Sequence, residues 1–172
     1  MKIFNLIKNS LFGNKEQGVM CGCCGKFSHD FSLSFRYPDC QFDPKNKENI
    51  LDDDLCFIKE QNAFFVRVIL EVPIIGHDTP FTWGVWVSQS QENFEYYKKH
   101  FRKDLSGRIT FGWLSNILPV YEDTFAIMSN VKFIEKGKRP KIEIQECDHQ
   151  LYYDYINGIT MERAEEFMSE FR

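Results

Sequence analysis

The chain has 172 residues, which fits a single domain large enough to bury a core of its own. Its content of 43% hydrophobic and 27% charged residues is that of a folded globular protein and excludes a disordered chain. A net charge of -4 excludes the basic surface on which nucleic-acid binding depends, and it favours a basic protein partner or none.

Residues 1–18 are expected to form an N-terminal helix and linker ahead of a single domain over residues 19–172. The apolar residues between positions 2 and 12 recur at helical spacing and predict a short amphipathic helix. No secretory cleavage site follows, and no stretch approaches the roughly 20 apolar residues that a membrane-spanning helix needs. We therefore expect a cytoplasmic protein without membrane contact.

Strand-like segments dominate the chain after a loop-rich stretch over residues 37–54. Residues 63–72 are rich in β-branched and aromatic side chains, as is typical of a central strand. In residues 140–146, Ile142 and Ile144 alternate with polar side chains, so one face of this strand should be buried. The other strands are expected over residues 55–60, 82–90, 108–115 and 125–135.

Three helices are predicted from capping residues and helical spacing. Ser90 can cap a helix over residues 91–101, and Thr160 can cap a final helix. Between them, residues 149–157 predict a helix that should end at Gly158. A run of strands with one helix in the middle and others at the ends indicates an α+β fold. We expect an antiparallel sheet with flanking helices and an N-terminal cysteine-rich turn.

That cysteine-rich turn predicts a structural zinc site. Cys21 and Cys24 are separated by two residues and precede a glycine, a spacing that lets two thiolates reach one zinc ion. With His29 the pattern resembles the first three ligands of a retroviral-type zinc knuckle, but Ser34 occupies the place of the fourth. A redox pair or reduced packing cysteines are the alternatives. The residues that could complete the site are Cys40, Cys56 and His149.

All three tryptophans fall in two short segments of similar composition, residues 81–94 and 110–124. Aromatic residues on paired strands pack in a core more often than they bind ligands, but tryptophans beside serine and asparagine can also line a cleft. We expect the three indoles to lie close together across neighbouring or facing strands. The candidate binding residues are Trp83, Trp86, Trp113, Asn116, Asp123 and His149.

Several motifs occur together: Cys-x2-Cys-Gly at residues 21–25, DLCFI at 54–58, FTWGVWVSQSQENF at 81–94, FGWLSNILPVYEDT at 111–124, and the stretch from Arg139 to Thr160. In this order they resemble the bacterial family catalogued as domain of unknown function 2199. The resemblance runs from about Cys21 to Arg163. It implies a single bacterial domain and supplies no catalytic residue. The family's pattern includes the cysteine at Cys56 and the histidine at His149, which implies both as candidates for the remaining zinc ligand.

The sequence contains no G-x-S-x-G, no H-E-x-x-H, no P-loop and no G-x-G-x-x-G motif. We therefore expect a non-catalytic protein-binding domain with a structural zinc site held by Cys21, Cys24, His29 and Cys56. Small size, acidity and aromatic segments suit an immunity-like protein that neutralises a basic toxin. The alternative is an enzyme or small-ligand receptor that uses a cleft between the two tryptophan-rich segments.

Overall fold

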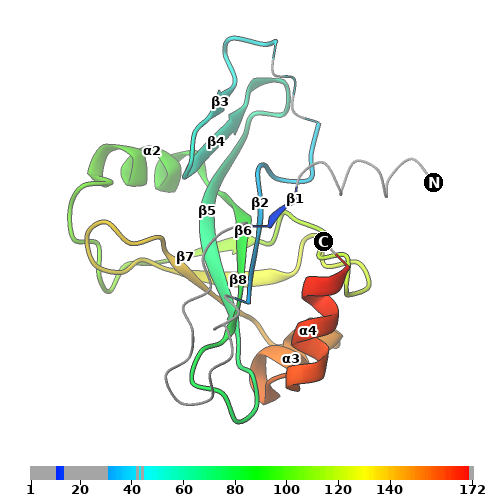
Figure 1. Ribbon diagram of the computed structural model, residues 1–172. Helices are drawn as coiled ribbons and strands as arrows, with labels where there is room; N and C mark the ends of the chain where they lie inside the picture. The colour runs from blue at the N-terminus through cyan, green and yellow to red at the C-terminus, as the bar shows by residue number, and fades with distance from the viewer. Residues whose placement is uncertain (1–10, 14–30, 42, 44, 171–172) are drawn as a thin grey trace.

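The computed structural model describes residues 11–13, 31–41, 43 and 45–170 of the chain (Figure 1). The expected boundary at residue 18 lies outside these residues. So do three of the expected zinc ligands, Cys21, Cys24 and His29.

Nine strands join in one sheet within the described residues. The main path runs β1-β2-β6-β5-β9-β8-β7, and the β3–β4 hairpin attaches to β5 through β4. The two long central strands, β5 and β6, pair along nearly their whole length. The strands are β1 (Leu11–Gly13), β2 (Ser32–Phe35), β3 (Ile50–Leu51), β4 (Leu55–Ile58), β5 (Ala63–Val72), β6 (Phe81–Gln89), β7 (Ile109–Trp113), β8 (Met128–Lys132) and β9 (Lys141–Ile144).

The sheet is mixed, so the prediction of an antiparallel sheet is only partly confirmed. Strand β2 runs parallel to β6, and β9 runs parallel to β5, while the other pairs are antiparallel. The side-chain pattern of a strand reports which face is buried and not which strand lies beside it. Strand β9 lies beside β5 although β6, β7 and β8 come between the two strands in the sequence. A prediction that pairs only consecutive strands as hairpins does not find this long-range pairing.

The N-terminal prediction differs from the structure where the two overlap. Leu11 and Phe12 fall within the helix predicted over residues 2–12, but both belong to strand β1. This strand pairs with β2, so residues 11–13 are part of the sheet. The rest of the predicted helix lies outside the described residues.

The three helices predicted beyond Ser90 are confirmed. They are α2 (Gln91–His100), α3 (Gln150–Asn157) and α4 (Met161–Ser169), with a 3-10 turn over Lys59–Gln61. The hydroxyls of Ser90 and Thr160 accept backbone N–H groups of the first turns of α2 and α4. Gly158 ends α3 with a φ of 83°, a conformation that favours glycine. Figure 1 shows α3 and α4 together at one side of the sheet, away from α2.

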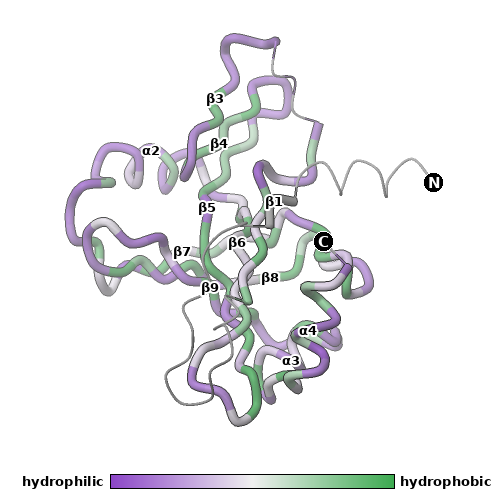
Figure 2. Tube along the Cα trace, in the orientation of Figure 1, coloured by the Kyte–Doolittle hydropathy of each residue, from purple (hydrophilic) through white to green (hydrophobic). Residues whose placement is uncertain are grey.

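Both faces of β6 are buried, and hydrophobic residues follow the central strands in Figure 2. Trp83 and Trp86 are fully buried, and their separation by three positions along the strand turns their side chains to opposite faces. Phe167 of α4 lies 6.1 Å from the Trp83 ring, so the last helix closes this part of the core. Trp113 is 49% exposed, so the three indoles do not share one buried core.

Strand β7 folds back onto the end of β6, which curls the sheet. The backbone N–H of Trp113 donates to the Ser88 hydroxyl at 3.0 Å, and the N–H of Ser115 donates to the Trp86 carbonyl at 2.8 Å. A Cβ atom on Gly112 would lie 2.3 Å from the Ser88 carbonyl oxygen, so only glycine permits this approach. The otherwise open edge of β7 is thereby covered.

Candidate functional site

Five large apolar side chains lie exposed on β7, β8 and the loop that leads into β8. We call this set the apolar stripe: Ile109, Phe111, Trp113, Phe125 and Met128, each between 42% and 57% exposed. Trp113 lies directly opposite Met128 in the strand pair. The rings of Phe111 and Trp113 meet edge to face with their centroids 4.8 Å apart. Single exposed apolar residues are common, whereas a contiguous group marks an interaction surface.

Strand β7 turns its large side chains outward because its inward positions require small ones. Thr110 and Gly112 face the end of β6, where the Thr110 hydroxyl donates to Gln89 Oε1 at 2.7 Å. No larger residue fits at Gly112. Ile109, Phe111 and Trp113 alternate with these two positions and therefore face solvent. The solvent-exposed face of a sheet is usually polar, whereas the exposed face of β7 is apolar.

A strained turn presents Phe125 beside the end of β7. Ala126 has a φ of 64°, in the left-handed region that costs a residue with a Cβ atom roughly 1–2 kcal/mol. Its N–H donates to the Leu114 carbonyl at 2.8 Å, which fixes the turn to the strand. The Asp123 carboxylate accepts the N–H of Phe125 at 2.9 Å. Such strain persists where surrounding contacts hold it, and it is frequent at functional surfaces.

Three acidic residues lie near the end of the stripe that contains Trp113 and Met128. Glu122 and Asp123 are exposed just before Phe125. The Gln145 N–H donates to the Met128 carbonyl at 2.9 Å, which places the exposed Glu146 beside the same end. Of the predicted binding residues, the structure thus brings Trp113 and Asp123 to one surface.

Asn116 and Trp86 lie together in the interior. The Trp86 N–H donates to Asn116 Oδ1 at 2.8 Å, and the Asn116 amide donates to the Tyr37 carbonyl at 3.1 Å. Both side chains are fully buried, as is Trp83. The two tryptophan-rich segments are therefore in direct contact where the alternative function would place a cleft.

His149 caps the helix α3. Its Nδ1 accepts the N–H of Leu151 at 3.0 Å, so the neutral ring carries its proton on Nε2. Nε2 is buried and has no hydrogen-bond partner among the described residues. In this arrangement neither ring nitrogen offers a lone pair to a metal ion or to a substrate proton.

A family comparison covers most of these elements. A family model described as "Uncharacterized protein conserved in bacteria (DUF2199)" matches residues 20–159. The chain belongs to the DUF2199 family. The matched range includes the whole apolar stripe and ends before α4. No curated protein and no solved structure matches the chain.

A buried carboxylate that no sequence motif indicated joins α3 to α4 in this DUF2199 protein. Asp154 accepts hydrogen bonds from the Tyr121 hydroxyl at 3.0 Å and from Gln150 at 2.7 Å. Arg163 of α4 completes the cluster with an ion pair of 3.0 Å to Asp154. Asp154 follows Leu151 by three residues on the buried face of α3, and this polar residue at an apolar position was the available signal.

The predicted metal ligands are described only at Cys56. Its side chain is fully buried on β4, and burial, with the Cys40 thiol nearby, raises the pKa of its thiol to about 12. Among the described residues no group of three or more His, Cys, Asp or Glu side chains is arranged to hold a metal. None of the described helices is long and apolar enough to cross a membrane.

Proposed function

We propose that this DUF2199 protein binds a protein partner that carries basic residues, and that the apolar stripe is the contact surface. The observation that carries the proposal is the group of five exposed apolar residues around Trp113. Exposed aromatic residues that become buried on association supply much of the affinity of protein interfaces, and tryptophan is among the most enriched of them.

The charge of the protein supports a basic partner. The chain carries a net charge of -4, and Glu122, Asp123 and Glu146 flank the stripe. Exposed charges of this kind act chiefly on the rate of association and on partner choice. Small size and acidity suit the immunity-like role of neutralising a basic toxin, which is the specific form of the proposal.

The test begins with a partner captured on the immobilised full chain, identified and purified. Its affinity is then measured for the wild type and for the variants Trp113→Ser and Phe111→Ser. We expect each substitution to weaken binding by about 30-fold or more, because interface anchors contribute about 2 kcal/mol or more. Ile156→Ser is the matched control, since Ile156 is 55% exposed on α3 and lies outside the stripe.

Two results would contradict this function. One is a partner whose affinity for the Trp113→Ser and Ile156→Ser variants is the same. The other is a chain that sediments as a dimer and becomes monomeric only in the Trp113→Ser variant, because the stripe would then bind a second copy of the chain.

A further inference from the structure

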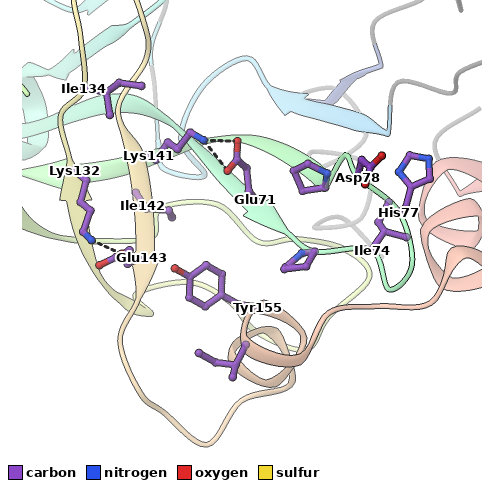
Figure 3. Close-up of a pocket in the computed structure, with 13 residues that line it drawn as sticks. Glu71, Ile74, His77, Asp78, Lys132, Ile134, Lys141, Ile142, Glu143 and Tyr155 are labelled. Atoms are coloured by element: carbon purple, nitrogen blue, oxygen red, sulfur yellow. Dashed lines mark hydrogen bonds and ion pairs between the residues drawn. The ribbon is translucent and has the colours of Figure 1, made fainter.

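A pocket of about 610 Å³ opens between strands β5, β8 and β9 and the helix α3 (Figure 3). Its apolar walls include Pro73, Ile74, Pro80 and Ile156. None of the three tryptophans lines it, so it is a different place from the cleft expected between the tryptophan-rich segments. No residue of the apolar stripe lines it either, so its ligand is independent of the protein partner.

Two ion pairs line the pocket on the strand side. Lys141 of β9 contacts both carboxylate oxygens of Glu71 on β5, at 2.7 and 2.8 Å, and Lys132 of β8 pairs with Glu143 of β9. The four side chains are between 37% and 47% exposed. Exposed pairs contribute only about 0–1 kcal/mol, so another cation can take the place of the lysine at either carboxylate at little cost.

A tyrosine hydroxyl faces the same space. Figure 3 shows the Tyr155 ring extending from α3, with its hydroxyl turned toward the side of the pocket that holds Glu143. The hydroxyl makes no hydrogen bond to another described residue. Burial, with the nearby carboxylates of Glu143 and Glu71, raises the pKa of Tyr155, which therefore stays a neutral hydroxyl with free acceptor capacity.

The balance of charges favours a cation over an anion. The charged groups that line the pocket are the carboxylates of Glu71, Asp78 and Glu143 and the ammonium groups of Lys132 and Lys141, and the His77 imidazole lines it as well. An ammonium group has three N–H donors, and Glu71, Glu143 and Tyr155 offer three oxygen acceptors beside an aliphatic wall. We propose that this pocket binds a small organic cation that carries a primary ammonium group on an aliphatic body.

The test uses two probes of the same size and opposite charge, n-butylammonium and butyrate. Each is titrated into the full chain labelled with ¹⁵N, and the amide shifts of residues around Tyr155, Glu143 and Lys132 are followed. We expect n-butylammonium to shift these amides with millimolar affinity, which suits so small a ligand, and butyrate to leave them unchanged.

Three variants test whether the Glu143 carboxylate binds the ammonium group. Glu143→Gln should weaken binding of n-butylammonium about tenfold, because a charged acceptor becomes a neutral one. Lys132→Ala should tighten it, because Glu143 loses its internal partner. Glu165→Gln makes the same change of charge at an exposed position on α4 and should have no effect.

The proposal is overturned if neither probe shifts the pocket amides. It is also overturned if butyrate binds and the Lys132→Ala variant abolishes that binding, because the pocket would then be an anion site. All variants lie at the surface, and a well-dispersed amide spectrum shows that each one folds.

Discussion

The backbone N–H of Trp86 donates to the side-chain oxygen of Asn116 at 2.8 Å, across 30 residues of sequence. Asn116 also donates to the Tyr37 carbonyl at 3.1 Å, so one buried amide joins β6, the segment after β7 and the segment after β2. Burial of such a group is favourable only while its partners are satisfied.

Replacing Asn116 by alanine should lower the free energy of unfolding by about 2–4 kcal/mol, because the buried Trp86 N–H loses its acceptor and the half-buried Tyr37 carbonyl loses the donor that Asn116 supplies. Urea unfolding measures the change. Asn157→Ala is the control, since the Asn157 amide donates to Tyr153 at the surface and its loss should cost less than about 1 kcal/mol. Equal effects of the two substitutions would refute the structural role of Asn116.

We expect Trp83 to contribute to folding stability and Trp113 to contribute to binding. Trp83→Ala should cost about 3–5 kcal/mol of folding stability, because its indole is fully buried against Phe81 and Phe167. Trp113→Ala should cost about 1 kcal/mol or less, because half of this side chain is exposed. Thermal unfolding of the two variants is the measurement, and a Trp113 variant as unstable as the Trp83 variant would show that Trp113 belongs to the core.

Two tyrosines should resist ionisation until the chain unfolds. Burial raises the pKa of Tyr97 and of Tyr121, with Asp54 adding to the effect at Tyr97 and Asp154 at Tyr121. A tyrosine is neutral when protonated, so a folded pKa above the unfolded value of about 10 favours the folded state below that pH. This contribution is lost as the pH rises from about 10 through the folded pKa.

Ultraviolet absorbance during an alkaline titration follows the seven tyrosines of the chain. We expect late ionisation, coincident with the loss of secondary structure, to include Tyr97 and Tyr121, and a Tyr121→Phe variant to lose one late-titrating group. Ionisation of all seven tyrosines near pH 10 in a chain that remains folded would be incompatible with these burial effects.

The zinc site stays a prediction that rests on Cys21 and Cys24. Protein purified without a metal-binding tag should contain about one zinc ion per chain and lose stability when the metal is chelated. Cys24→Ser should remove the metal, whereas Cys147→Ser, a change at a half-buried cysteine outside the predicted ligand set, should retain it. Absence of stoichiometric metal from the wild-type chain would rule out the site.

Residues close together in the sequence predicted the helices and strands of this fold, but they did not predict the pairing of strands that are far apart in the sequence. Ser90, Thr160 and Gly158 act where the sequence places them, because capping and left-handed φ values depend on a few adjacent residues. The partner of β9 depends on where the rest of the chain has already folded, so its parallel pairing with β5 has no local signature.

The candidate site shows the same division. Composition alone grouped Trp86 with Trp113, whereas the structure buries Trp86 completely and leaves about half of Trp113 exposed. The alternation of large and small residues over positions 109–113 indicates which side chains face solvent. Thr110 and Gly112 are too small to form the buried face of a strand unless another strand approaches closely. Because aromatic and aliphatic side chains are expected in a core, Ile109 and Phe111 were not predicted to be surface residues.

Intrinsic fluorescence of the complex tests the central claim most directly, because Trp113 is the exposed tryptophan while Trp83 and Trp86 are fully buried. Addition of the purified partner should shift the emission to shorter wavelength and protect it from acrylamide quenching, and the same titration of a Trp113→Phe variant should show neither change. An emission spectrum that stays unchanged while the partner binds would contradict the proposal that the apolar stripe is the contact surface.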